Sequence, residues 1–165
     1  MKIFDFGLAK ELSHNLMNTD GTYNLTEMTG SPRYMAPEVA NGQPYSATCD
    51  SYSFAVLLWE MLACKRPYEL YTPKTLRSKV YNGAHKRPVI NEKWPVPIKL
   101  LLKRCWAQNL QERNNMEEVY HILRKECVRC RDGDASGLEH TRRRSTYVFR
   151  PAKGASKSKR LMLTH

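Results

Sequence analysis

Asp5-Phe6-Gly7 and Gly30-Ser31-Pro32-Arg33-Tyr34-Met35-Ala36-Pro37-Glu38 are the two motifs that decide the fold, and a long polar loop joins them. The apolar run Lys2-Ile3-Phe4 ahead of the first motif predicts a short buried strand. The residues between the motifs are rich in serine, threonine and asparagine, which favour turns. A polar loop of this length between two fixed ends is typically either functional or disordered.

The first motif has the chemistry of a magnesium ligand at the end of a strand. Mg²⁺ prefers oxygen ligands, typically one or two carboxylates together with substrate phosphates. Asp5 could serve as such a ligand, with Phe6 packed beneath it and Gly7 supplying an unusual backbone angle. The tripeptide alone also fits an ordinary turn after a strand, so the rest of the chain has to decide between the two interpretations.

Further motifs follow in a fixed order along the chain. Twenty-eight residues separate Gly7 from Ala36, which opens the motif Ala36-Pro37-Glu38. Downstream come Asp50-Ser51-Tyr52-Ser53-Phe54-Ala55-Val56-Leu57-Leu58-Trp59-Glu60-Met61, then Arg66-Pro67-Tyr68, Cys105-Trp106 and Arg113. In this order and spacing, residues 1–130 resemble the C-terminal part of a eukaryotic protein kinase domain, of the serine/threonine type and its tyrosine-kinase-like branch.

The resemblance implies a mainly α fold: the helical bundle of a protein-kinase-like C-terminal lobe, with a short β element and an activation loop, and with the N-terminal lobe absent. It divides the chain into an activation segment (residues 5–38), a helical lobe (residues 39–130) and a basic tail (residues 131–165). The tail has too little apolar content to fold alone, so we expect it to be disordered.

Hydrophobic periodicity and capping residues predict where the helices lie. Residues 48–62 are apolar nearly all round, so this helix must be covered by neighbours, and Ser46 or Thr48 can cap it. Thr72-Pro73 opens a second helix, which Gly83 ends. A single helical turn is expected at residues 8–12.

Two further helices are expected in the last third of the lobe. The apolar face of the first consists of Ile98, Leu101, Leu102 and Cys105. Asn115 and Glu118 form a capping box that opens the second, which runs to about Cys130. The residues expected to point inward from this last helix are Val119, Ile122 and Leu123.

The kinase resemblance assigns roles to the two motifs. Asp5, with Phe6 and Gly7, would bind the magnesium that bridges the phosphates of ATP. Ser31 would place its hydroxyl against the catalytic loop. The platform that reads the residue after the phosphoacceptor would consist of Ser31, Pro32, Arg33, Tyr34, Met35 and Ala36. The cofactors implied are ATP and Mg²⁺, and the partner is a protein substrate.

The resemblance also implies structural residues and modification sites. Glu38 and Arg113 would form a long-range ion pair, although the two residues alone are equally compatible with separate surface charges. Asp50 would hydrogen-bond the backbone of the catalytic loop, or else serve as a simple carboxylate at a helix start. The candidate phosphorylation sites are Thr19, Thr22, Tyr23, Thr26, Thr29 and, after three arginines in the tail, Ser145.

Several parts of a complete kinase do not occur in the sequence. No His-Arg-Asp tripeptide exists in the chain, and no glycine-rich loop precedes Asp5. We therefore expect the chain to be a piece of a longer serine/threonine kinase, read from an internal methionine, and inactive alone. Without an upstream helix, part of the Phe54–Met61 surface should face water. The alternative is a non-catalytic, kinase-like protein-interaction module.

Three positions depart from the usual kinase pattern. Ala55 stands where the family usually has glycine, Ser51 where it has an apolar residue, and Asn114 where proline commonly follows the arginine. These departures leave open a domain whose activity has decayed.

Composition limits the class of protein. The net charge is +11, and residues 131–165 contain nine basic and three acidic residues. Five cysteines, an odd number without a regular framework, favour a reducing compartment. No secretory signal and no membrane-spanning run is present, so a cytoplasmic protein is expected, and the basic tail leaves nuclear import open.

Only the tail suggests nucleic acid, and we do not expect such a partner. The pair Cys127 and Cys130 lacks a second pair at regular spacing, so no zinc site is expected.

Overall fold

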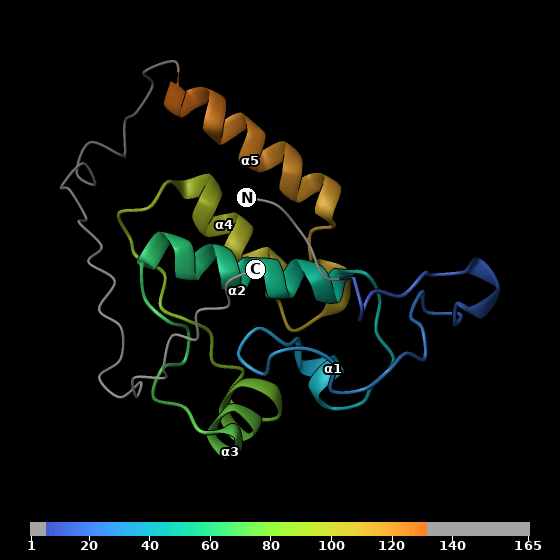
Figure 1. Cartoon of the computed structure of the whole chain (residues 1–165). Coiled ribbons are helices and arrows are strands. Elements are labelled where there is room, and N and C mark those ends of the chain that lie inside the picture. The colour runs from blue at the N-terminus through green and yellow to red at the C-terminus, as the bar shows by residue number, and fades with distance from the viewer. Residues whose placement is uncertain (1–5, 132–165) are drawn as a thin grey trace, which may run out of the picture.

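A computed structural model describes residues 6–131, and helices are the main regular secondary structure in this part of the chain (Figure 1). The elements in order are the 3₁₀-helix η1 (His14–Leu16), α1 (Pro37–Ala40), α2 (Thr48–Ala63), α3 (Pro73–Leu76), the π-helix η2 (Arg77–Tyr81), α4 (Val96–Cys105), the 3₁₀-helix η3 (Leu110–Glu112) and α5 (Met116–Arg131). The prediction of a mainly α fold is confirmed. The strand expected at Lys2-Ile3-Phe4 lies outside the described residues.

Helix α2 lies in the middle of the fold, with α4 and α5 on one side and α1 and α3 on the other (Figure 1). Its buried side chains are Ser51, Tyr52, Ala55, Val56, Leu58 and Trp59. The expected exposure of this helix is present in part: Met61 is 46% exposed, whereas Phe54 and Leu57 are half-buried. The packed side of α2 therefore forms the main core together with α4 and α5.

The start of α2 differs from the prediction. The cap position is Ala47, which has no side chain able to accept a hydrogen bond. Ser46 Oγ, one residue further out, accepts a long bond of 3.4 Å from the Thr48 backbone N–H. At the other end, Cys64 adopts a left-handed φ of 50° and ends the helix, a position where glycine is the usual residue.

Helices α4 and α5 agree with the periodicity and the capping residues. The four expected positions of α4 are all buried: Ile98, Leu101, Leu102 and Cys105. The capping box of α5 is reciprocal, because Glu118 N–H donates to Asn115 Oδ1 and Asn115 N–H donates to Glu118 Oε2, both at 2.9 Å. Val119 is buried, and Ile122 and Leu123 pack against the core at half burial.

The second predicted helix starts as expected and then changes its winding. Thr72 Oγ1 accepts a 3.2 Å bond from the Thr75 N–H, and Pro73 occupies the first helical position. From Arg77 the chain forms a π turn, closed by a 3.0 Å bond from the Asn82 N–H to the Arg77 carbonyl oxygen. A Cβ atom at Gly83 would lie 2.2 Å from the Ser78 carbonyl oxygen, so the chain can leave the helix here only at glycine.

The helical turn predicted at residues 8–12 is wrong. The chain makes a turn earlier, where the Ala9 N–H donates to the Phe6 carbonyl oxygen at 3.0 Å, and a short 3₁₀-helix follows at His14–Leu16. Leu8 is 66% exposed, so an isolated turn would bury no apolar side chain to offset the cost of helix nucleation.

Within residues 6–131, no helix combines the length and the apolar content that a membrane crossing would require.

Candidate functional site

The loop of residues 31–36, called here the platform loop, is tied to the segment that follows α2. Arg33 Nη1 donates to the carbonyl oxygens of Pro67, at 3.1 Å, and of Tyr68. The loop turns on itself, since the Tyr34 N–H donates to the Ser31 carbonyl oxygen at 3.0 Å. A guanidinium that holds two backbone carbonyls fixes the loop against a stretch more than thirty residues away.

Two tyrosine hydroxyls hold the platform loop from other elements. Tyr34, in the loop, donates its hydroxyl to Glu60 Oε2 on α2. Tyr81, at the end of η2, donates its hydroxyl to the Pro32 carbonyl oxygen. Burial, followed by the hydrogen bond to Glu60, raises the pKa of Tyr34, and burial raises the pKa of Tyr81 to about 12. Both tyrosines therefore keep their protons, and their role as donors, at physiological pH.

The platform loop has one face in solvent and one in the core. Ser31 and Pro32 are exposed, while Met35 and Ala36 are buried at 7% and 1% exposure. The apolar end of the loop thus anchors it, and the polar end faces outward. The candidate platform residues named from the sequence therefore lie together on one short, well-anchored loop.

Glu38 and Arg113 form a buried ion pair next to the platform loop. Arg113 Nη1 lies 2.6 Å from Glu38 Oε1, and Nη2 lies 2.9 Å from Oε2, so the pair is bidentate. The side chains are 4% and 0% exposed. Arg113 Nε also donates to the Ala107 carbonyl oxygen at 2.9 Å. The Glu38 carboxylate on α1, directly after the platform loop, is therefore bound to the lobe between α4 and α5.

The ring of Tyr52 on α2 contacts two arginines, an arrangement that the sequence reasoning missed. The guanidinium carbons of Arg87 and Arg113 lie 5.0 and 5.1 Å from the ring centroid. Arg87 Nε donates to the Trp106 carbonyl oxygen at 2.8 Å, so both arginines also hold the end of α4. A fully buried tyrosine in an apolar helix was the available signal, since buried aromatic rings favour cations on their faces.

The Tyr34–Glu60 contact was missed as well. Glu60 interrupts an otherwise apolar stretch of α2, and a carboxylate in such a position needs a partner. That interruption was the signal, although nothing in the sequence alone indicates which residue the partner is.

The segment before the platform loop is folded around Thr22. The Thr22 hydroxyl and backbone N–H both donate to Asp20 Oδ1, at 2.6 and 3.0 Å, and Asn18 Nδ2 donates to the Thr22 hydroxyl. The Thr22 hydroxyl is the main cause that lowers the pKa of Asp20. Tyr23 pairs with Tyr45 through two backbone hydrogen bonds of 2.9 and 3.1 Å.

These contacts separate the candidate phosphorylation sites into two groups. Thr22 and Tyr23 are buried, so in this conformation they are closed to an enzyme. Thr19 and Thr26 are exposed, and Thr29 is half-buried with its hydroxyl donated to backbone carbonyls. Ser145 lies outside the described residues.

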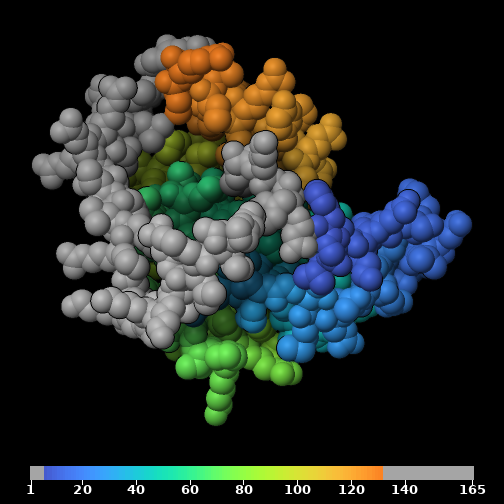
Figure 2. All heavy atoms as spheres, in the orientation of Figure 1, coloured from blue at the N-terminus to red at the C-terminus, as the bar shows by residue number. Residues whose placement is uncertain are grey.

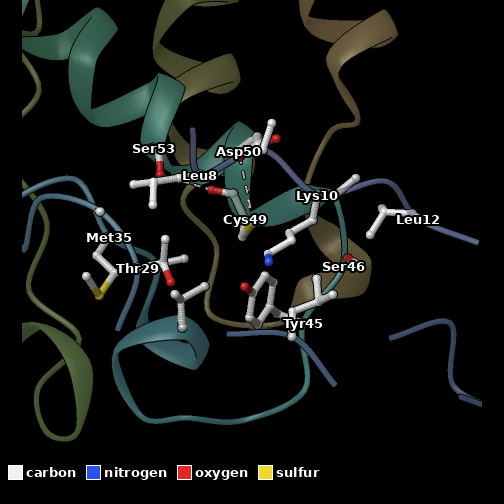
Figure 3. Close-up of a pocket in the computed structure, with 16 residues that line it drawn as sticks. Leu8, Lys10, Leu12, Thr29, Met35, Tyr45, Ser46, Cys49, Asp50 and Ser53 are labelled. Carbon is white, nitrogen blue, oxygen red and sulfur yellow. Dashed lines mark hydrogen bonds between the residues drawn. The ribbon is translucent and has the colours of Figure 1, made fainter. Parts of the chain in front are cut away.

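A cavity of about 320 Å³ lies between the platform loop, the residues that follow Gly7 and the first turn of α2 (Figure 3). Its walls include Leu8, Met35, Tyr45, Cys49, Asp50 and Ser53. Asp50 is exposed, and its carboxylate accepts a weak 3.8 Å contact from the Cys49 thiol. Burial, with the Asp50 charge as a second cause, raises the pKa of Cys49 to about 12, so this thiol is unreactive.

The first motif is only partly described. Asp5, the expected magnesium ligand, lies outside the described residues. Phe6 is 71% exposed, and Gly7 lies in a turn without being among the glycines of positive φ. Within residues 6–131, no three His, Cys, Asp or Glu side chains are grouped closely enough to hold a metal ion. The magnesium-binding role expected of Asp5 stays a prediction.

Comparison with known proteins shows similarity to protein kinases. The sequence model of the family described as protein tyrosine and serine/threonine kinase matches residues 1–123. Mitogen-activated protein kinase kinase kinase 7 of Bos taurus is 34% identical over 125 residues, which cover 74% of this chain and 20% of that protein. Dual specificity protein kinase shkB of Dictyostelium discoideum is 38% identical over 122 residues, which cover 72% of this chain and 18% of that protein. The chain spans about a fifth of the length of these curated relatives.

Proposed function

This chain belongs to the protein tyrosine and serine/threonine kinase family, in its tyrosine-kinase-like branch, and we propose that it supplies the substrate-binding side of a serine/threonine protein kinase. In that reaction the γ-phosphoryl group of ATP passes to a hydroxyl of a protein. Catalysis of phosphoryl transfer rests on positioning and charge neutralisation, since the protein forms no covalent bond to the substrate.

The observation that carries the proposal is the way the platform loop is held. Three elements fix it: Glu60 on α2 through Tyr34, Tyr81 on η2 through Pro32, and the chain after α2 through Arg33. Because reacting groups must be placed to within a fraction of an ångström, a loop that orients a substrate has to be rigid. In the proposal, exposed Ser31 and Pro32 face the substrate backbone, and the buried residues behind them keep them in place.

The ion pair of Glu38 and Arg113 has a positioning role in the proposal. It joins α1, which directly follows the platform loop, to the backbone at Ala107, after α4. The pair touches no reacting atom, so its effect on phosphoryl transfer is exerted through the loop.

The chemistry of ATP and Mg²⁺ is assigned to residues outside the described part. When bound, Mg-ATP supplies the phosphoryl group, and Asp5 is the residue of this chain proposed to bind the metal. The proton acceptor of a kinase catalytic loop is missing from the sequence. We propose that a catalytic loop contacts Asp50 at the cavity beside α2, because this exposed carboxylate lines the same cavity as Met35 and Ala36 of the platform loop.

The test is phosphoryl transfer measured with and without an upstream kinase segment. The whole chain alone, given labelled Mg-ATP and a serine-containing protein, should transfer no phosphate above a protein-free blank. A chimera should transfer phosphate when this chain follows the upstream kinase residues of its mitogen-activated protein kinase kinase kinase 7 relative. Replacing Ser31 by alanine in that chimera should lower the rate at unchanged ATP affinity.

Two results would count against the proposal. Phosphoryl transfer by the chain alone would show that its chemistry does not depend on a missing catalytic loop. A chimera that folds and binds ATP, yet phosphorylates no serine, threonine or tyrosine, would show that the platform loop does not position a substrate. Phosphorylation of tyrosine alone would overturn the serine/threonine assignment.

A second candidate, the non-catalytic interaction module, is favoured by large apolar side chains at the surface. Leu70 and Val89 are 92% and 86% exposed. Such a module would bind a partner protein without any requirement for ATP, so an inactive chimera together with partner binding by the chain alone would favour it.

A further inference from the structure

The stretch that includes α3 and η2 carries charge of one sign. Between Leu70 and Asn91 the sequence contains five lysine and arginine residues and neither aspartate nor glutamate. In Figures 1 and 2 this green segment projects from the lower edge of the molecule. Its charge is therefore presented on a protruding surface rather than spread over the lobe.

One of the five basic residues has a structural role, and the other four do not. Arg87 holds carbonyl oxygens at Trp106 and Val80 and lies over Tyr52. The other four are Lys74, Arg77, Lys79 and Lys86, and all are exposed. The ion pairs found among residues 6–131 involve other cations, so these four charges have no carboxylate partner in the described part of the chain.

Two contacts place Lys79 close to Lys86 and to the Tyr71 ring. The Lys86 N–H donates to the Lys79 carbonyl oxygen at 2.8 Å, which places the two lysines next to each other. Lys79 Nζ lies 5.6 Å from the centroid of the Tyr71 ring. Leu70, the neighbour of Tyr71, is 92% exposed. We call the surface formed by Leu70, Tyr71, Lys74, Arg77, Lys79 and Lys86 the basic ridge.

Hydrogen bonds connect the basic ridge to the platform loop. Tyr81, two residues after Lys79, donates to the Pro32 carbonyl oxygen. Tyr68, two residues before Leu70, accepts from Arg33 and donates its hydroxyl to the Lys86 carbonyl oxygen at 3.3 Å. A protein that lies along the ridge would therefore run close to the loop proposed to bind the phosphoacceptor.

We propose that the basic ridge docks an acidic segment of the protein substrate, with an apolar residue of that segment seated on Leu70. This inference rests on the proposed function, because it names the class of substrate. Complementary charge raises association rates and selects partners, and an apolar contact at the centre adds affinity. The kinase thereby selects substrates that carry glutamate or aspartate at a distance from the phosphorylated hydroxyl.

The surface fits an acidic protein better than it fits nucleic acid or a membrane. Single-stranded nucleic acid binds by stacking bases on open aromatic rings, whereas the Tyr71 ring is half-buried beside Lys79. Membrane surfaces are bound by an apolar helix face flanked by basic residues. On the ridge, Leu70 is a single apolar side chain that is 92% exposed, which suits contact with one apolar residue of an acidic segment.

The test measures binding without ATP, so that its failure is distinct from a failure of the kinase assignment. The whole chain is titrated against a fluorescent glutamate-rich peptide containing one leucine, at low and at high salt. The double variant Lys74→Glu with Arg77→Glu should weaken binding by about tenfold or more. The control Lys103→Glu with Lys125→Glu makes the same charge change on exposed positions of α4 and α5 and should leave binding within about twofold.

Each outcome decides the proposal. Weaker binding in the ridge variant but not in the control, together with weaker binding by Leu70→Ser and loss of affinity at high salt, supports it. Equal weakening by both double variants overturns it, since net charge would then explain the binding. No weakening by either variant also overturns it, since the basic side chains of the ridge would then not be needed. Tighter binding of single-stranded DNA or of phosphatidylserine vesicles also overturns it. Should the double variant fail to fold, the single variant Lys86→Glu, outside the helix, replaces it.

Discussion

At the scale of single residues, Arg113 has the largest set of contacts among the candidate site residues. It binds both carboxylate oxygens of Glu38, the Ala107 carbonyl oxygen and the face of Tyr52. Breaking such a pair leaves a charge buried without a partner. The arginine is therefore required for folding more directly than for chemistry.

Replacing Arg113 by alanine should lower the free energy of unfolding by about 3–5 kcal/mol. Denaturant unfolding followed by circular dichroism measures this. Lys99→Ala is the matched control, because it removes a 3.0 Å ion pair whose partner Glu92 is 88% exposed, and it should have a much smaller effect. Equal effects of the two variants would mean that burial of the Glu38–Arg113 pair does not matter for stability.

The protein should become more stable when Ser51 loses its hydroxyl. Its side chain on α2 is fully buried, and its Oγ has no hydrogen-bond partner among residues 6–131. An unpaired buried hydroxyl costs about 1–3 kcal/mol, so Ser51→Ala should raise the free energy of unfolding by about 1 kcal/mol or more.

The control for this prediction is Ser53→Ala, two residues along the same helix. Ser53 Oγ donates to the Cys49 carbonyl oxygen at 3.2 Å, so its removal gains helix propensity but loses a hydrogen bond. A denaturant unfolding curve for each variant gives the two free energies of unfolding to compare. If Ser51→Ala destabilises the protein, the hydroxyl must have a partner that is not seen.

The residue scale also shows what a sequence can and cannot indicate. Glu38 and Arg113 are seventy-five positions apart, and only the kinase resemblance suggested their contact, which the structure displays. Tyr81 and Arg87 were not identified as important, because their partners are backbone carbonyls on distant loops. Backbone acceptors carry no side-chain signature, so such contacts depend on tertiary geometry alone.

At the scale of elements, local chemistry was sufficient for α4 and α5, but not for the start of α2, where Ala47 takes the cap position. The α5 capping box and the apolar face of α4 were predicted from spacing, because both depend on neighbours three or four residues apart. The π turn of η2 was not predicted, and the helical turn that was predicted at residues 8–12 does not form. Both are set by what packs against the segment, and periodicity does not report that.

The α5 capping box should make the free energy of unfolding depend on pH in the acidic range. Hydrogen bonds from the Asn114 side chain and then from the Asn115 backbone lower the pKa of Glu118 below its ordinary 4.5. A carboxyl whose pKa is lower in the folded state stabilises the protein above its unfolded pKa. That contribution is lost as the pH falls below about 4.5 and through the folded-state pKa.

The variant Glu118→Gln should therefore lose less stability than the wild type between neutral pH and about pH 3. Thermal unfolding at both pH values measures the difference. Glu117→Gln, an exposed neighbour outside the capping box, should retain the full wild-type loss. The variant Asn115→Ala should cost about 1 kcal/mol at neutral pH. An unchanged acid response in Glu118→Gln would contradict the role of the box.

At the scale of the whole molecule, the described residues form two apolar clusters of unequal size. The main core joins α2, α4 and α5, whereas Leu76, Val80 and Tyr81 form a small cluster of their own around α3 and η2. Regions with few buried apolar contacts open at lower free energy than the core. The part that carries the basic ridge is therefore the less stable part.

Hydrogen exchange should show this division. Amide hydrogens of residues 76–81 should exchange faster than those of residues 55–62 in the middle of α2, measured by mass spectrometry under native conditions. Added glutamate-rich peptide should slow exchange in residues 74–86 and leave α5 unchanged. Uniform protection across both clusters would mean that the small cluster unfolds only with the core.

The π turn of η2 sets the rotational phase of the residues that follow it. A π turn holds one residue more per closing hydrogen bond than an α turn, and here the bond joins Asn82 to Arg77. In plain α-helical winding, one extra residue would turn everything after it by roughly 100° about the helix axis. The π turn absorbs that extra residue within one turn, so the Tyr81 hydroxyl still reaches the Pro32 carbonyl oxygen. Deleting one residue of η2 would therefore leave Tyr81 near its present phase, whereas α-helical winding at the present length would turn its hydroxyl away from the loop that faces the substrate.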